Sequence, residues 1–105
     1  MRVISRRALR EFWEVHPQAK GPLSAWFRIM EQGTFADLNA LKATFGTADY
    51  VAPYTIFDVG GNKFRVIAAI HYNRERVYVR KVLTHAEYDQ WSADMRRGKI
   101  RRGGK

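Results

Sequence analysis

Three side chains in this 105-residue sequence could do chemistry together, because one is a permanent cation and the other two can titrate. Arg65 lies in the segment 63–72 among mostly apolar neighbours, where burying a guanidinium is costly unless it meets an anion. His85 and Tyr88 follow the next apolar segment and are three residues apart, a spacing that places them on one face of a helix. The three residues therefore indicate an anion site beside groups able to transfer protons.

A purely structural interpretation of the same residues stays open. In this interpretation Arg65 pairs with Glu87 or Asp89 inside the fold. Tyr88 then belongs to the core, and His85 only begins a helix. No external ligand is required in that case.

Basic residues outnumber acidic ones, and the excess is concentrated at the C-terminal end. Nineteen Lys and Arg against ten Asp and Glu give a net charge of +9, which favours a polyanionic partner such as nucleic acid. From Met95 onward no residue is acidic and six are basic: Arg96, Arg97, Lys99, Arg101, Arg102 and Lys105. The segment 96–105 is interpreted either as a solvated tail or as an arm that follows RNA phosphates without reading sequence.

Several classes of protein are excluded or disfavoured by what the sequence lacks. It has no cysteine, which excludes disulfides and thiolate chemistry and fits a cytoplasmic protein. His16, His71 and His85 lack metal-ligand spacing, and no glycine-rich nucleotide-binding motif is present, so we expect neither metal nor cofactor. No apolar run reaches the length of a membrane span, so we expect no membrane partner.

The elements that must position these residues follow from apolar periodicity. Two amphipathic helices are expected, one from Ser5 to about His16 and one from Gly21-Pro22 to Gly33, followed by a short helix or turn over 37–45. Strands are expected over 54–59, 63–72 and 77–83, and a helix capped by Thr84 over 85–95. Tight turns between the strands predict an antiparallel meander, and helices before strands predict an α+β fold with helices on one face. We expect one domain over 1–95 and a basic tail over 96–105.

The chain resembles the HigB toxin family, a group of small basic toxins related to the RelE-like mRNA interferases. The resemblance is carried by the segment 57–67, FDVGGNKFRVI, together with the segment 82–89, VLTHAEYD. The opening strand, the two helices and the segment 41–45, LKATF, extend it over nearly the whole chain. It implies a RelE-like fold in which two N-terminal helices pack on an antiparallel sheet and a short helix follows.

The resemblance also implies an activity, partners and site residues. Such toxins are metal-independent endoribonucleases that cut mRNA, commonly at the ribosome, and a helix-turn-helix, HigA-like antitoxin neutralises them. Arg65 matches the strand arginine that holds the scissile phosphate, and His85 and Tyr88 match further catalytic positions. The RNA- or phosphate-binding candidates are Lys63, Arg80, Lys81, Arg96 and Arg97. The sequence offers no obvious second general base.

Two functions from other classes remain as alternatives. One is a non-catalytic RNA- or ribosome-binding module with the same basic surface. The other is a toxin of RelE fold with a target other than RNA. His85 and Tyr88 discriminate among them, because a binding module needs charge but no titratable group beside Arg65.

Overall fold

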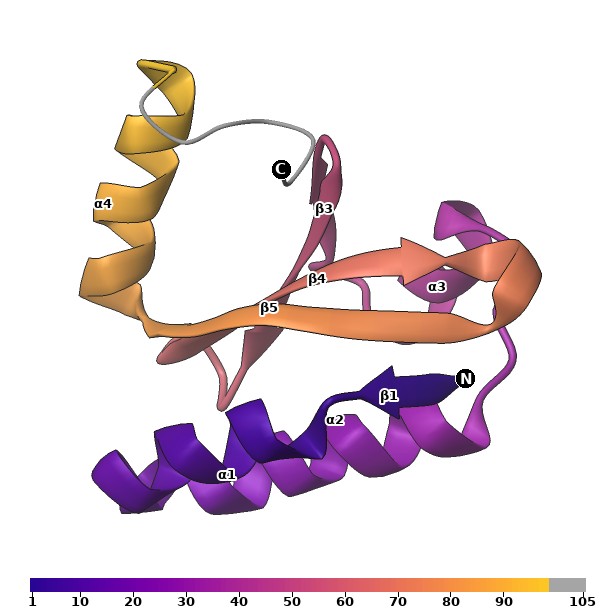
Figure 1. Ribbon diagram of the computed structural model, residues 1–105, viewed down its shortest axis with the longest axis horizontal. Coiled ribbons are helices and arrows are strands. Elements are labelled where there is room, and N and C mark those ends of the chain that lie inside the picture. The colour runs from indigo at the N-terminus through magenta and orange to yellow at the C-terminus, as the bar shows by residue number, and fades with distance from the viewer. Residues whose placement is uncertain (99–105) are drawn as a thin grey trace.

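The computed structural model describes residues 1–98 of the chain (Figure 1). Its elements follow in the order β1 (Arg2–Ile4), α1 (Arg6–Val15), η1 (Pro17–Ala19), α2 (Lys20–Gln32), α3 (Leu38–Thr44), β2 (Asp49–Val51), β3 (Tyr54–Val59), β4 (Phe64–His71), η2 (Tyr72–Arg74), β5 (Arg76–Thr84) and α4 (His85–Arg96). This arrangement confirms the predicted α+β class. None of the helices within residues 1–98 has the length and apolarity to cross a membrane.

All five strands belong to one sheet, in the order β1-β5-β4-β3-β2. The predicted antiparallel meander of β3, β4 and β5 is confirmed. β1 pairs with β5 in parallel, so the sheet is mixed at this edge rather than antiparallel throughout. β2, which the sequence does not predict, pairs with β3 at the opposite edge. With three residues each, these edge strands are too short for a clear alternation of apolar and polar residues.

The turn between β3 and β4 explains the paired glycines. Gly60 and Gly61 adopt φ values of 64° and 69°, a left-handed conformation that glycine reaches without steric cost. The turn places Val59 opposite Phe64 and therefore Asp58 opposite Arg65. The register of this turn thus determines which residue faces Arg65 on the neighbouring strand.

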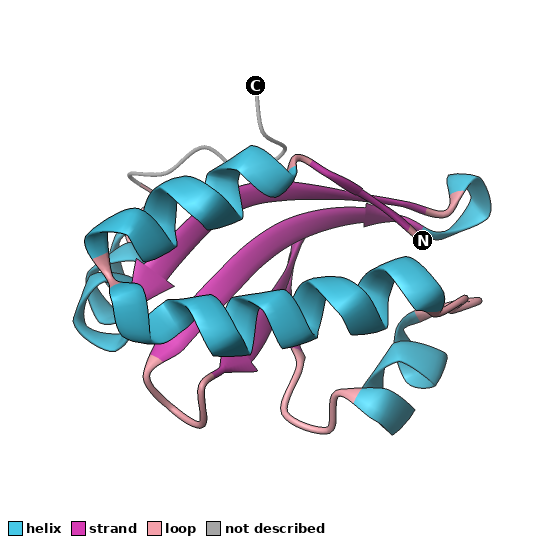
Figure 2. Ribbon diagram, turned by 90° about the horizontal axis from the view of Figure 1, so that it is seen from below, coloured by secondary structure: helices cyan, strands magenta, loops and turns pink. Residues whose placement is uncertain are grey.

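Helices cover both faces of the sheet. α1 and α2 lie side by side over the first face, where Leu9 and Trp26 are fully buried in the larger core (Figures 1 and 2). α4 packs on the second face, where Trp91 and Met95 enclose a smaller core with Ile67. The prediction of helices on one face only is therefore wrong for α4, because alternation along β4 gives the sheet a second apolar patch that needs cover.

Two predicted helix ends differ from those in the structure, and the predicted end of α2 at Gly33 is confirmed. α2 begins at Lys20, before Gly21-Pro22, because a proline in the first helical turn replaces an N–H that has no partner within the helix. Gly33 ends α2 with φ −87°, and its glycine is explained by packing, because a Cβ there would lie 2.7 Å from the Phe35 ring. α4 extends to Arg96, one residue into the predicted tail, and residues 99–105 lie outside the described part of the chain.

Candidate active site

Arg65 and Tyr88 meet on the second face of the sheet, and His85 begins α4 at the same end of the sheet. Arg65 projects from β4 between Asp58 on β3 and Leu83 on β5, its partners in the strand register. α4 starts directly after β5 ends and brings His85 and Tyr88 to this end of the sheet. The meander and the first turns of α4 therefore build the site together.

Arg65 is buried, with 7% of its surface exposed, and is held by its own hairpin. Its Nε lies 3.0 Å from Asp58 Oδ1, and its Nη2 donates to Asn62 Oδ1 at 2.7 Å. Its Nη1 donates to the carbonyl oxygens of Asn62 and Phe64 at 3.2 and 3.1 Å. Both terminal nitrogens of the guanidinium therefore donate within the hairpin, and Nε lies beside the Asp58 carboxylate as an ion pair. The ion pair that the structural interpretation assigned to Glu87 or Asp89 is formed with Asp58.

Asp58 and Asn62 are parts of the site that the sequence analysis missed. The predicted second strand begins at residue 63, whereas the structure closes the turn with Val59 opposite Phe64 and so places residues 58 and 65 opposite each other. The Asp58 side chain keeps 28% of its surface exposed, so this ion pair lies at the border between core and solvent.

Tyr88 lies against the guanidinium and closes the site from the α4 side. The Arg65 Cζ is 5.3 Å from the centroid of the Tyr88 ring, a cation–π distance. The same ring stacks on Trp91, with centroids 5.8 Å apart and planes at 25°. Burial raises the pKa of Tyr88 above its usual 10.0, and the Asp49 carboxylate raises it further. At neutral pH Tyr88 is therefore a protonated hydrogen-bond donor, not a base.

His85 is oriented by a carboxylate that the sequence analysis did not include in the site. Its Nδ1 lies 3.2 Å from Asp89 Oδ2, one helical turn further along α4. This contact leaves Nε2 for proton transfer, the arrangement of a base oriented by a third group. The i, i+4 spacing of His85 and Asp89 could have revealed the pair.

Two further contacts fix the start of α4 against the β3–β4 hairpin. The His85 backbone N–H donates to the Lys63 carbonyl oxygen at 2.9 Å. Thr84 and Glu87 form a complete capping box, as predicted: Thr84 N donates to Glu87 Oε1 at 2.9 Å, and Glu87 N donates to Thr84 Oγ1 at 3.2 Å. The backbone around His85 is therefore held by the capping box and by the bond to Lys63.

The predicted phosphate-binding residues divide into a near and a distant set. Lys63 is exposed in the β3–β4 turn, and Lys81 lies opposite Ile67 on the same face of the sheet as Arg65. Arg80 occupies a register shift in β5 and is exposed. Arg96 and Arg97 lie at the far end of α4, about 16 Å along the helix from His85 at 1.5 Å per residue. The structure does not bring these two arginines into the site.

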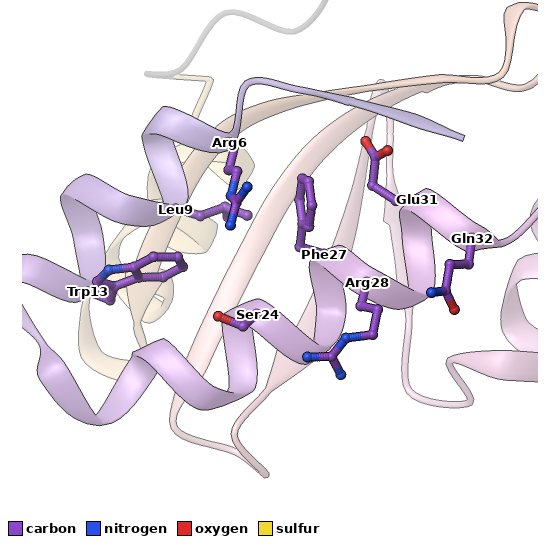
Figure 3. Close-up of a pocket in the computed structure, with 8 residues that line it drawn as sticks. All are labelled: Arg6, Leu9, Trp13, Ser24, Phe27, Arg28, Glu31 and Gln32. Carbon is purple, nitrogen blue, oxygen red and sulfur yellow. The ribbon is translucent and has the colours of Figure 1, made fainter.

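A separate pocket of about 340 Å³ lies between α1 and α2 (Figure 3). Trp13 and Phe27 form apolar walls, and the guanidinium of Arg6 lies over the Phe27 ring at 5.0 Å. None of the predicted site residues lines this pocket, which belongs to the helical layer on the first face. The pocket and the Arg65 site are therefore on opposite sides of the sheet.

Comparison with known proteins points to one family. The sequence model described as HigB_toxin, RelE-like toxic component of a toxin-antitoxin system, matches residues 19–91. The "mRNA interferase toxin HigB" of Escherichia coli strain K12 is 37% identical over 96 residues, which cover 89% of this chain and 92% of that protein. The "mRNA interferase HigB" of Shigella flexneri matches equally, and that of Escherichia coli O6:H1 is 29% identical over 94% of this chain and 99% of its own length. The matched residues include Arg65, His85 and Tyr88.

Proposed function

The chain belongs to the HigB toxin family, the RelE-like toxic component of toxin–antitoxin systems, and from this premise we propose that it is an mRNA interferase, an endoribonuclease that inhibits translation and growth. The observation that carries the proposal is the similarity to mRNA interferases over 89% of the chain. The basic, titratable site built on β4 and α4 supports it, because RNA cleavage without a metal needs charge stabilisation and proton transfer.

The proposed cleavage is a transfer of the phosphoryl group within the RNA. The 2′-oxygen attacks phosphorus as its proton leaves, the bond from phosphorus to the 5′-oxygen breaks, and that oxygen takes up a proton. The products are a 2′,3′-cyclic phosphate and a 5′-hydroxyl. The step therefore needs one base, one acid and a cation at the phosphate.

We assign these three roles to residues of the site. His85, oriented by Asp89, takes the proton from the 2′-hydroxyl. Tyr88, protonated at neutral pH because burial raises its pKa, supplies a proton to the 5′-oxygen. Their three-residue spacing on α4 puts their Cβ atoms about 5–6 Å apart, within reach of the two oxygens on one phosphate. Arg65 stabilises the dianion through its positive charge.

The surrounding cations position the RNA rather than cleave it. Lys63 and Lys81 flank the site and contact neighbouring phosphates, with Arg80 further along β5. Arg96 and Arg97 add affinity at a distance from the cleaved bond. These contacts are electrostatic, so we expect them to weaken with added salt.

We also propose the setting in which the toxin acts. It works in the cytoplasm on mRNA held by the ribosome, whose RNA attracts a chain of net charge +9. A HigA-like antitoxin with a helix-turn-helix domain neutralises it by covering the basic face or by blocking access to the ribosome. Association with acidic segments of that antitoxin should slow as salt is added. A pull-down from the native host tests this partner.

The function is tested by inducing the chain in cells and mapping the 5′ ends of mRNA. We expect growth arrest and new 5′ ends with the unchanged chain. His85→Ala should lower the cleavage rate by about 10²–10⁴, the usual contribution of a general base. Asp89→Asn should lower it less, since it removes the carboxylate charge beside the imidazole.

Asp94→Asn is the matched control. Asp94 lies on the same helix and accepts a hydrogen bond from Gln90 rather than from His85, so this variant should cleave like the unchanged chain. Growth arrest without new 5′ ends would contradict the nuclease and favour binding without cleavage. Equal cleavage by all four proteins would contradict the assigned site.

A further inference from the structure

We propose that His71 and Tyr78 form a stacking site for one base of single-stranded RNA, next to the nucleotides at the cleaved bond. Arg80 holds the phosphate of that nucleotide. The inference rests on the proposed function, because it assigns a substrate contact to the same face of the sheet. It adds a binding site for a nucleobase, whereas the proposed function assigns only contacts to phosphates and to the reacting oxygens.

α4 covers only part of the second face. The smaller core under α4 includes Ile56 and Ile67, but it does not extend to Ala69, two residues further along β4. Beyond Ile67 this face carries Ala69 and His71 from β4 and Tyr78, opposite Ala69, from β5. Arg65 precedes them on the same face. One side of the sheet therefore has a covered end with the Arg65 site and an uncovered end with two aromatic rings.

The two rings pack edge to face, and both keep some exposed surface. The centroids of His71 and Tyr78 are 5.2 Å apart and their planes are at 89°, an edge-to-face contact. The partner directly opposite Tyr78 is Ala69, whose side chain is too small to cover a phenol ring. His71 is exposed and Tyr78 is half-buried. Aromatic surface therefore remains open to a ligand.

A register shift between Ile67 and Ala68 places a cation beside these rings. The partners of Ile67 and Ala68 are Lys81 and Val79, so Arg80 is the extra residue of a bulge in β5. Bulges twist a strand and redirect a side chain, and here the Arg80 guanidinium lies over one face of the Tyr78 ring, with Cζ 5.4 Å from its centroid. A cation fixed beside an aromatic ring matches a nucleotide, which has a phosphate next to a base with a π face.

The cations at the uncovered end form no ion pair within residues 1–98. The ion pairs within residues 1–98 are Arg7–Glu11, Arg65–Asp58 and His85–Asp89, so Arg76, Arg80 and Lys81 have no acidic partner there. Three cations without an ion-pair partner favour the binding of a polyanion. Single-stranded RNA fits both the rings and the cations, because its bases stack on aromatic side chains and its phosphates bind Arg and Lys.

The position relative to Arg65 agrees with a neighbouring nucleotide. Ala69, the partner of Tyr78, is four residues from Arg65 along β4, which is about 13 Å at the usual rise of a strand. Lys81 lies between them, opposite Ile67. The series Arg65, Lys81, Arg80 is therefore a line of cations along one face, with the two rings at its end.

The experiment uses the full chain and a single-stranded RNA whose 2′-hydroxyls are methylated so that it cannot be cut. A 2-aminopurine base at successive positions reports stacking by a fall in fluorescence, and titration gives Kd. We expect quenching at one position in particular. Removing the base at that position should weaken binding about tenfold, within the range for a base stacked on an aromatic side chain.

Variants connect that position to the rings. Tyr78→Leu should weaken binding about tenfold, and removing the base should then cost nothing more. Tyr78→Phe keeps the ring and should bind like the unchanged chain. Tyr50→Leu is the matched control, because Tyr50 is an exposed tyrosine on β2 whose register partner, Thr55, faces away from Arg65.

The outcomes separate this inference from the proposed function. Either of two results would overturn the stacking site, even if mRNA is cut in cells. In the first, removing the base does not weaken binding to the unchanged chain. In the second, the losses of affinity caused by Tyr78→Leu and by base removal add. A mapped stacking position in a chain that cuts no mRNA would support the site and contradict the nuclease. A chain that binds no RNA would overturn both.

Discussion

At the scale of single residues, Arg65 has both an internal and a proposed external role. Its ion pair with Asp58 and its bonds to Asn62 make it part of the β3–β4 hairpin. Loss of activity in an Arg65 variant would therefore not by itself identify a phosphate contact. The pairing with Asp58 provides the means to separate the two roles, since the orphaned carboxylate can be removed as well.

Arg65→Ala should lower the free energy of unfolding by about 1–3 kcal/mol, because it leaves the partly buried Asp58 carboxylate without its cation. The double variant Arg65→Ala with Asp58→Ala should recover part of that loss. Cleavage should stay absent in both, since neither has a cation at the phosphate. Denaturant unfolding and cleavage assays measure the two effects. Cleavage restored together with stability would show that Arg65 acts only within the fold.

Tyr88 provides a prediction on pH. Burial raises its folded-state pKa above 10.0, so between the unfolded and folded pKa values the folded chain holds a proton that the unfolded chain has released. The free energy of unfolding should therefore fall as pH rises above about 10. Tyr88→Phe cannot titrate and should show a smaller fall in Tm between about pH 9.5 and 11.

Tyr72 belongs in the same comparison, because burial also raises its pKa. Tyr72→Phe should reduce the alkaline fall in Tm as well, and the double variant should reduce it most. Tyr50→Phe, at an exposed tyrosine, is the matched substitution. If Tm falls with rising alkaline pH at the same slope in all these proteins, burial does not keep the two hydroxyls protonated.

At the scale of elements, the start of α4 connects the sheet to the catalytic side chains. His85 is its first residue and Tyr88 lies in its first turn, so both depend on how firmly this turn is held. The capping box of Thr84 and Glu87 and the bond from His85 N to the Lys63 carbonyl hold it. Helix ends otherwise leave N–H groups unpaired and tend to fray.

Thr84→Ala should cost about 1 kcal/mol of stability, the usual value of an N-cap, and should lower the cleavage rate more than RNA affinity. Loosening the first turn displaces the proposed base while the surrounding cations stay in place. Ser5→Ala is the control, because Ser5 caps α1 without a side-chain hydrogen bond. Equal losses of activity in the two variants would show that general destabilisation, not the position of His85, is responsible.

At the scale of the whole molecule, charge and shape divide the protein into two sides. α1 and α2 occupy the first face (Figure 1). The cations of β4 and β5 line the second. The net charge of +9 includes Lys99, Arg101, Arg102 and Lys105, which lie outside the described residues. Their contribution to RNA binding can be measured without knowing where they lie.

Removing residues 99–105 should weaken RNA binding at low salt and flatten its dependence on salt. For single-stranded RNA, every phosphate that the tail no longer neutralises should reduce the slope of log K against log salt by about 0.7. The cleavage rate at saturating RNA should stay the same, because His85 and Tyr88 are retained. Binding titrations at several salt concentrations measure the slope. An unchanged slope would show that the tail is a solvated segment only.

Local sequence was enough to predict most elements and the family. The change from helical to alternating periodicity, the Gly60-Gly61 turn and the Thr84 capping box depend on residues close together in the chain, and all three are confirmed. The motifs around Arg65 and His85 likewise predict the family that the comparisons show. Such signals can be interpreted without knowledge of the fold, because they arise from residues that are close in sequence.

Only the tertiary structure decided which groups meet. The pairing of Arg65 with Asp58, the position of α4 on the second face and the contact of Arg80 with Tyr78 each depend on more than one element or on an irregular strand. They follow from strand register, from helix packing and from a bulge, which no local periodicity encodes. A buried guanidinium needs partners wherever the fold provides them, so the sequence alone could predict that Arg65 has a partner but not which one.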